Sequence, residues 1–383
     1  MKFTVKRAAF ISYLNDVQRA ISSKVAIDIL KGIKLTLSAD ALKLTGSDAD
    51  ISIETIISIG DDKAALQVEE EGSVVLPANF FINIVKKLPE DSMTLDVNER
   101  FQATITSGSS EFRINGLDPN EYPRLPEIDT EDQLVLPADV FRQIISQTVV
   151  AVSTQEMRPI LTGVHLVIKD KTLLAVATDS HRLSQRKLKL DNVSSTMHYD
   201  VIIPGHSLNE LGRMLGSIED EVVIQIADSE NQALFTFGHT SYYTRLLEGM
   251  YPDTEQLIPQ NSTTKMQFNG PEMLRSIERA SLLSHAGQNN VVKLSLKVGE
   301  QTATLSGSSP EIGKVEEELQ FNKLEGNDID ISFNPDYMKD ALRSFGQAEI
   351  TLAFTQPLRP FTLTPTEEDE DFVQLITPVR TFN

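Results

Sequence analysis

The residues that first suggest chemistry in this chain are Asp179, Ser180 and His181, which stand side by side. A serine nucleophile, a histidine base and an aspartate are the groups that carry out acyl transfer in many hydrolases. Consecutive residues on a strand point to alternating faces, however, so these three do not form a relay by themselves. The sequence has no Gly-x-Ser-x-Gly motif, no phosphate-binding glycine loop and no histidine spacing typical of metal sites. We therefore expect no catalytic residue, no metal and no cofactor, and we interpret the chain as a non-enzyme.

The elements that must position any functional residue belong to a unit that recurs along the chain: an alternating apolar strand, a proline and a helical pattern. Its prolines are Pro77, Pro137, Pro204, Pro271 and Pro335. Successive gaps between them are 60, 67, 67 and 64 residues, and residues 1–10 have the same form without the proline. Proline is accepted in the first turn of a helix, because the N–H that it lacks has no partner there. The sequence therefore predicts six strand-helix units and a repeat architecture.

A larger repeat has about twice this length. Residues 30–35 match residues 161–166 at an offset of 131, and a Tyr-Pro pair follows each repeat, at Tyr122 and at Tyr251. The prolines around each pair predict an extended, stiff linker. We place the domain boundaries at these linkers, which predicts three domains of two units each, at residues 1–127, 128–255 and 256–383.

Between the helices, apolar residues alternate with polar ones, which is typical of half-buried antiparallel strands. In domain 1 the alternating positions are Ile33, Leu35, Leu37, Leu42, Leu44, Ile51, Ile53 and Ile56. In domain 3 they are Val292, Leu294, Leu296, Ala303 and Leu305. The helices have narrow apolar stripes, such as Phe10, Leu14, Val17 and Ile21, so each is expected to cover a sheet with one face only. These patterns predict an α+β fold with one helix and about four strands per unit.

Composition excludes several classes of protein. The chain has no cysteine, so it has no disulfide and no thiolate zinc site. A strand rather than a signal pattern opens the sequence, and the apolar runs are too short to span a bilayer, so we expect a cytoplasmic protein without a membrane partner. The net charge of −20 argues on its own against nucleic acid. It describes the average surface, however, and the exposed helix faces mix acidic residues with a larger number of basic ones.

The order and spacing of these features resemble the beta subunit of bacterial DNA polymerase III, the sliding clamp family. The most specific parts are residues 178–183, residues 251–253, residues 334–337 and the tail at 378–380, and the similarity spans the chain. The resemblance implies a head-to-tail homodimer that closes into a ring, with the helices inside and the sheets outside. Double-stranded DNA would pass through the ring without being read. The implied function is that of a processivity factor, which tethers the replicative polymerase to DNA and slides with it.

The resemblance also implies a groove that binds short linear peptides. Its implied partners are the catalytic subunit of the replicative polymerase, the clamp loader, and other polymerases and repair proteins that carry clamp-binding peptides. The implied groove residues are Leu161, Thr178, Ser180, His181, Arg182, Leu183, Pro252, Gln256, Leu257, Asn334, Tyr337, Leu358, Pro360, Leu375, Ile376, Thr377, Pro378, Val379 and Arg380. The family usually has glycine where Ser180 stands and an apolar residue where Thr377 stands, which bears on the turn geometry and on peptide preference.

Two further sets of residues carry the ring hypothesis. Lys24 and Gln155 match DNA-contacting positions of the family, and predicted position on a helix adds Arg19, Lys86, Arg142, Arg158, Arg213 and Arg279. The four implied dimer residues are Phe112, Ile114, Leu282 and Leu283. Without ring closure, the same three domains would form a monomeric peptide-binding scaffold that does not encircle DNA. The four dimer residues therefore separate the two hypotheses, and ordinary core positions are the alternative for each of them.

Overall fold

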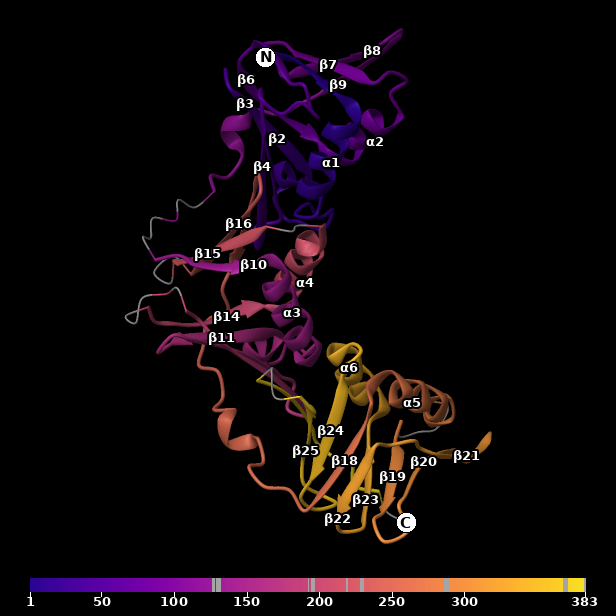
Figure 1. Cartoon of the computed structure of the whole chain (residues 1–383). Coiled ribbons are helices and arrows are strands. Elements are labelled where there is room, and N and C mark those ends of the chain that lie inside the picture. The colour runs from indigo at the N-terminus through magenta and orange to yellow at the C-terminus, as the bar shows by residue number, and fades with distance from the viewer. Residues whose placement is uncertain are drawn as a thin grey trace. The chain divides into compact units, whose positions relative to one another are not determined.

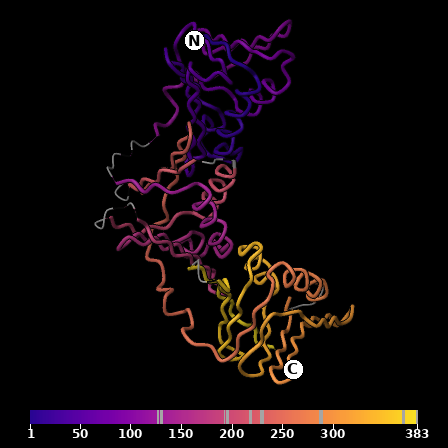
Figure 2. Tube along the Cα trace, viewed as in Figure 1, coloured from indigo at the N-terminus to yellow at the C-terminus, as the bar shows by residue number. Residues whose placement is uncertain are grey.

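The computed structural model describes residues 1–125, 128, 132–191, 193, 197–217, 220–227, 231–285, 290–367 and 371–381. The chain divides into two compact units, Met1–Phe141 with Glu210–Leu246 and Arg142–Asn209 with Leu247–Asn383. Figures 1 and 2 trace the chain from its indigo N-terminus to its yellow C-terminal part. Antiparallel sheets and helices make up both units, as the α+β prediction requires. No helix in the described residues is long and apolar enough to cross a bilayer.

The first unit contains two sheets. The five-stranded sheet has the order β5 (Gln67–Glu70), β1 (Lys2–Lys6), β7 (Ser92–Val97), β8 (Gln102–Ser107), β9 (Ser110–Asn115). The eight-stranded sheet has the order β10 (Leu134–Pro137), β15 (Glu221–Ala227), β16 (Gln232–Phe237), β17 (Thr240–Arg245), β4 (Ile51–Ser58), β3 (Ala41–Ser47), β2 (Gly32–Leu37), β6 (Gly72–Pro77). Helices α1 (Arg7–Gln18) and α2 (Ala78–Lys87) contact each other. Helix α1 also contacts strands of both sheets, and α2 contacts β2 and β6 of the eight-stranded sheet.

The second unit also contains two sheets. The nine-stranded sheet has the order β14 (Tyr199–Pro204), β11 (Gly163–Lys169), β12 (Thr172–Thr178), β13 (Arg182–Lys189), β26 (Phe372–Ile376), β25 (Phe361–Pro365), β24 (Glu349–Phe354), β18 (Thr264–Asn269), β22 (Lys323–Gly326). The four-stranded sheet has the order β21 (Gly313–Glu318), β20 (Thr302–Ser309), β19 (Val292–Lys297), β23 (Ile329–Phe333). Helices α5 (Gly270–His285) and α6 (Pro335–Phe345) pack against each other. Helices α3 (Ala138–Thr148) and α4 (Gly205–Met214) have residues in both units.

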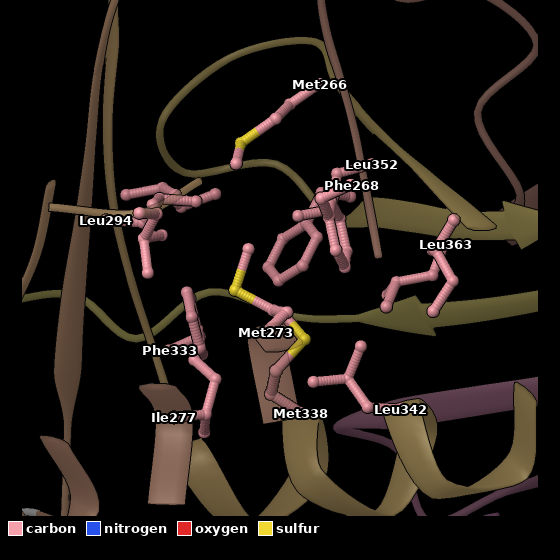
Figure 3. Close-up of a cluster of buried hydrophobic side chains, with 14 of the residues drawn as sticks. Met266, Phe268, Met273, Ile277, Leu294, Phe333, Met338, Leu342, Leu352 and Leu363 are labelled. Carbon is pink, nitrogen blue, oxygen red and sulfur yellow. The ribbon is translucent and has the colours of Figure 1, made fainter. Parts of the chain in front are cut away.

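Aromatic and aliphatic side chains hold the helices to the sheets. In the first unit, Phe10 of α1 meets Phe3 and Phe81 edge to face, at ring-centre distances of 6.1 Å and 6.0 Å. In the second unit, Figure 3 shows side chains of α5 and α6, such as Met273 and Met338, directed toward strand residues such as Phe268. All six of these side chains are almost completely removed from solvent, so apolar side chains of the helices and the strands together form the cores.

The recurring prolines mark the starts of the helices, with one correction. Pro335 is the first residue of α6 and Pro271 the second of α5, as predicted. Pro77, Pro137 and Pro204 instead end a strand, and the helix begins at the next residue. The fixed φ of proline suits both positions, because the last residue of each strand is already extended. The strand-helix unit therefore stands, while the place of the proline within it differs.

Two of the predicted inward positions are wrong. Strand β4 keeps strict alternation, so its inward residues are Ile51, Ile53, Thr55 and Ile57, and Ile56 is 37% exposed. Helix α1 ends at Gln18, so Ile21 lies beyond the helix and is only half-buried. The predicted domain boundary at residue 127 lies outside the described residues. The three-domain division at 127 and 255 stays a prediction.

The repeat offset of 131 residues has a steric basis. Gly32 opens β2 and Gly163 opens β11, and 163 − 32 = 131. A Cβ on Gly32 would lie 2.5 Å from a methyl carbon of Val75, and one on Gly163 would lie 2.6 Å from a methyl carbon of Ile202. Both distances are far shorter than a van der Waals contact, so the neighbouring strand comes too close for any side chain.

The two large sheets are assembled in the same way. β17 pairs with β4, with Thr240 opposite Thr55, and β26 pairs with β13, with Leu375 opposite Leu183. In both cases the last strand of one repeat joins the strand that follows the first helix and hairpin of another. The remaining strands of these two kinds are β9 and β21, and each lies at the edge of its sheet with one paired side.

Candidate functional site

The segment from Thr178 to Arg182 is a tight turn rather than a catalytic relay. Asp179 Oδ1 accepts backbone hydrogen bonds from His181 and Arg182, at 2.9 Å and 3.0 Å. Ser180 has φ 78°, and Thr178 Oγ1 accepts its N–H at 3.1 Å. The Asp179 carboxylate therefore binds backbone N–H groups of the turn and the Arg182 side chain. In a catalytic relay, one of its oxygens would instead bind the His181 ring. No group of His, Asp or Glu within the described residues is arranged to hold a metal ion.

The serine in this turn keeps the backbone conformation of a glycine. The equivalent turn in the first repeat has Ala49 at φ 82°, with Ser47 and Asp48 in the places of Thr178 and Asp179. Side-chain oxygens bind the same backbone N–H groups in both turns, which offsets the cost of a left-handed residue that is not glycine. Ser180 thus adopts a left-handed backbone conformation in this turn without being glycine.

Arg182 joins this turn to helix α6. Its Nε lies 3.0 Å from Asp179 Oδ2, and its Nη1 lies 2.7 Å from Asp340 Oδ2. Its guanidinium carbon is 4.7 Å from the ring centre of Tyr337, and the His181 ring stacks on Tyr337 at 6.4 Å. Two carboxylates thus hold one guanidinium over the tyrosine, which fixes the orientation of the Tyr337 ring. The sequence did not identify Asp340, although its place three residues after Tyr337 puts both on one helix face.

A small apolar cluster lies beside the turn. Leu161, Val176, Leu183, Ile202, Tyr251 and Leu375 are its buried members. Leu161, Leu183 and Leu375 are among the predicted groove residues, whereas Val176, Ile202 and Tyr251 are not. The Tyr251 ring lies 4.8 Å from that of His165, whose Nε2 is 2.7 Å from Asp200 Oδ1. Tyr251 therefore anchors the linker that follows β17 to the sheet of the second unit.

The Tyr251 hydroxyl also serves the turn, because it accepts the backbone N–H of Thr178 at 3.1 Å. Burial raises the pKa of Tyr251 to about 12, so the hydroxyl stays protonated well into the alkaline range. Replacing Tyr251 with phenylalanine leaves that buried N–H without its acceptor, so we expect a loss of about 1 kcal/mol in the free energy of unfolding. Urea unfolding measures the loss, and amide exchange at Thr178 should accelerate. Unchanged exchange at Thr178 would contradict this role.

The C-terminal tail is tied to the same region. The backbone N–H of Thr377 donates to His181 O at 2.8 Å, and that of Val379 donates to Ser332 O at 2.7 Å. Asn334 caps α6 through Asp336 N at 2.8 Å. Leu257 and Leu358 are 51% and 59% exposed, and Pro252 and Gln256 are exposed as well. Their membership of a groove stays a prediction, as does that of Pro360, Pro378 and Arg380.

One cavity of the second unit is lined by a different set of residues. It has a volume of about 480 Å³ and is lined by Gln143, Gln147, Phe345, Gln347, Ala348, Glu349, Pro365 and Glu367. None of the predicted groove residues lines it, so it is not the predicted peptide site.

The predicted DNA-contacting residues are exposed, and two of them are related by the internal repeat. Lys24 lies in the loop after α1, Gln155 lies in the loop that follows α3, and 155 − 24 = 131. Lys86 is in the last turn of α2, Arg142 is on α3, and Arg158 directly precedes a short 3₁₀ helix at Pro159–Thr162. Arg19 follows α1 rather than lying within it, which corrects its predicted place. The contact of any of these side chains with DNA stays a prediction.

The four predicted dimer residues do not occupy core positions. Phe112 is 40% exposed and Ile114 is half-buried, both on the edge strand β9. Leu282 is 73% exposed and Leu283 is half-buried, both near the end of α5. Exposed apolar side chains along an unpaired edge strand are a common feature of surfaces that pair with another chain.

Comparison with known proteins identifies the class and then the family. Family models for the N-terminal, central and C-terminal domains of the DNA polymerase III beta subunit match residues 1–126, 135–253 and 255–380. The beta chain of Streptococcus pneumoniae superimposes with a TM-score of 0.95 at 45% identity, over 99% of this chain and 100% of that one. These matches define a three-domain clamp fold that mixes helices and strands.

Sequence relatives agree with the structural matches. The beta sliding clamp of Bacillus subtilis is 47% identical over 383 residues, which is 100% of both chains. The sliding clamp structure from the same organism has a TM-score of 0.95 at 46% identity and covers 100% of both chains. A beta sliding clamp of Staphylococcus aureus is 46% identical, again over 100% of both chains. The chain belongs to the DNA polymerase III beta subunit family, the beta sliding clamps.

Proposed function

We propose that two copies of this chain close head to tail into a ring around duplex DNA. As a member of its family, the chain is a DNA sliding clamp, a non-catalytic processivity factor of DNA replication. The proposal adds how the ring closes, which side chains face the DNA and where partners bind. The alternative of a monomeric scaffold is not favoured by the family.

The observation that carries ring closure is the repeated way in which the sheets are joined. Two junctions within the chain pair the last strand of one repeat with the strand that follows the first helix and hairpin of another. These junctions are β17–β4 and β26–β13. The third junction of this kind would pair β9 with β21, and both are edge strands. A junction between different surfaces of identical chains is head to tail, and it closes into a ring when the rotation permits. Phe112, Ile114, Leu282 and Leu283 would then be covered by the partner copy.

An acidic protein can hold DNA in such a ring if the lining helices attract phosphates only weakly. Sequence-independent affinity comes from Lys and Arg at the phosphates, whereas base contacts would fix the protein at one position. The net charge of −20 keeps the rest of the surface from binding nucleic acid. Lys24 and Gln155, at equivalent places in two repeats, are our first candidates for contact with the backbone, joined by Lys86, Arg142 and Arg158.

The replacement Lys24→Glu tests the DNA-facing assignment. It removes one phosphate contact and adds repulsion, so we expect DNA affinity to fall about tenfold near 0.1 M salt, with a smaller salt dependence. Binding of a polymerase-derived peptide should be unchanged, which makes peptide affinity the control. The measurement is fluorescence anisotropy with a labelled duplex. Equal DNA affinity of the variant and the wild type would remove Lys24 from the DNA-contacting set.

We place the peptide groove over the apolar cluster of Leu161, Leu183 and Leu375, with His181, Arg182 and Tyr337 at its rim. The support is a buried apolar floor beside a few fixed polar groups, which is the usual composition of a binding groove. The proposed occupants are short peptides from the polymerase catalytic subunit, the clamp loader and repair proteins, with aliphatic or aromatic anchors. We propose the cytoplasm as the place where the ring acts.

A further inference from the structure

Glu210 is placed between two of the arginines that were predicted to face DNA. It lies on α4, and its Oε2 is 3.3 Å from Arg19 Nη1, directly after α1. Its Oε1 pairs with Arg213, one turn further along α4. The Glu210 side chain is 25% exposed, whereas the two arginines are 37% and 66% exposed. One partly buried carboxylate therefore occupies the guanidinium groups of two arginines that belong to different repeats.

Arg279 is held in the same manner on α5. Its Nε lies 3.0 Å from Glu317 Oε2, its Nη2 binds Oε1, and Ser276 Oγ donates to Oε1 at 2.7 Å. The paired guanidinium and then the serine hydroxyl keep the pKa of the Glu317 carboxyl below its usual range, although burial acts in the opposite direction. The carboxylate is therefore charged at neutral pH and occupies Arg279 in a two-pronged contact.

Three of the other predicted DNA-facing cations differ from Arg19, Arg213 and Arg279. Within the described residues, Lys24, Lys86 and Arg158 make no ion pair, whereas Arg19, Arg213 and Arg279 each pair with a glutamate. Ion pairs at the protein surface contribute little to stability, so a passing phosphate can replace the carboxylate at little cost. Arg19, Arg213 and Arg279 must therefore give up a carboxylate before they bind a phosphate, whereas Lys24, Lys86 and Arg158 need not.

We propose that Glu210 and Glu317 are built-in counter-ions, which compete with DNA phosphates for Arg19, Arg213 and Arg279 and so weaken the attraction of the ring for DNA. This inference rests on the proposed DNA-facing role of those arginines. A ring that slides must release each phosphate easily. An arginine releases a phosphate more easily when a neighbouring carboxylate can bind the guanidinium in its place. The two glutamates would thus give the ring an intermediate attraction for DNA phosphates. Without Arg19, Arg213 and Arg279 the attraction would be weaker, and with these arginines unpaired it would be stronger.

The replacement Glu210→Gln tests the inference, because glutamine keeps the size of the side chain and removes its charge. We expect the affinity for a labelled 40-base-pair duplex to rise about three- to tenfold at 50 mM salt. The logarithmic salt slope, measured up to 200 mM, should steepen by about 1 to 2, since each phosphate neutralised adds about 0.9. Glu300→Gln is the matched control, because Glu300 is exposed, makes no ion pair among the described residues and changes the net charge equally.

A double-mutant cycle shows whether the effect passes through the arginines. In an Arg19→Gln, Arg213→Gln background, the replacement Glu210→Gln should no longer raise the affinity or the slope. Glu317→Gln provides a second test if the first variant does not fold, with Arg279→Gln as its background. Its dimer mass is measured alongside, because β21 is also the proposed dimer edge.

The outcomes separate this inference from the proposed function. If both glutamate replacements behave like Glu300→Gln while Lys24→Glu still weakens DNA binding, the counter-ion role is wrong and the DNA-facing surface stands. If neither the glutamate replacements nor Lys24→Glu changes DNA binding, the DNA-facing assignment itself fails. A gain that persists without the arginines would also overturn the counter-ion role, because the glutamates would then act through general repulsion.

Discussion

Replacing Leu282 and Leu283 together with aspartate is expected to convert the dimer into folded monomers. Leu282 is 73% exposed and Leu283 half-buried near the end of α5, so the single chain tolerates charge there. In the proposed dimer both side chains lose contact with water, and burying an unpaired carboxylate costs several kcal/mol. A cost of roughly 3 kcal/mol or more raises the dimer Kd by more than about 100-fold.

Sedimentation velocity at micromolar concentration measures this change, and circular dichroism checks that the variant is folded. Ile59→Asp is the control, because Ile59 is also an exposed apolar residue, at 52%, and lies outside the proposed interface. The control should remain dimeric. A doubly substituted variant that sediments like the wild type would show that the proposed interface is wrong.

Deleting residues 378–383 is expected to abolish peptide binding and to leave the dimer intact. The deletion removes Val379, whose backbone N–H bonds to Ser332 O at 2.7 Å, together with the residues that we place in the groove wall. It spares Thr377, which is bonded to His181 O at 2.8 Å, and the whole of β26. Because a few side chains carry most of the affinity for a short peptide, we expect a loss of about 100-fold or more.

Calorimetric titration with a polymerase-derived peptide measures the loss, with dimer mass and melting temperature as controls. A shorter deletion of residues 382–383 is the control for loss of the chain end, and it should bind peptide normally. Undiminished peptide binding by the longer deletion would place the groove elsewhere.

The elements of the fold could be predicted because they depend on local patterns. The prolines and the period-two alternation located the strand-helix units, and the offset of 131 residues located the repeat. Ile56 was misplaced because two adjacent isoleucines occupy β4, and only strict alternation decides that Ile57 faces inward. The cap of α6 by Asn334 follows the same local logic, since the signal lies within two residues.

The contacts that shape the sites could not be predicted, because they join residues far apart in sequence. Arg182 meets Asp340 across 158 residues, and Arg19 meets Glu210 across 191 residues. No spacing rule connects such pairs, and the fold alone brings them together. Tyr251 is an intermediate case: its Tyr-Pro motif was recognised as a linker, but its burial depends on Thr178 and His165. The family resemblance supplied groove residues by position and gave no account of what holds them.

The measurement that tests the central claim most directly is retention on circular DNA before and after a single cut. The wild-type protein is loaded by a clamp loader onto a nicked plasmid, separated from free protein by gel filtration, and the plasmid is then linearised in half of the sample. A ring that encircles the duplex without gripping it should stay on the circle and slide off the linear ends, so the second sample should lose nearly all its protein. Equal retention on the two forms would contradict encirclement, because a protein held by contacts alone does not distinguish a circle from a line.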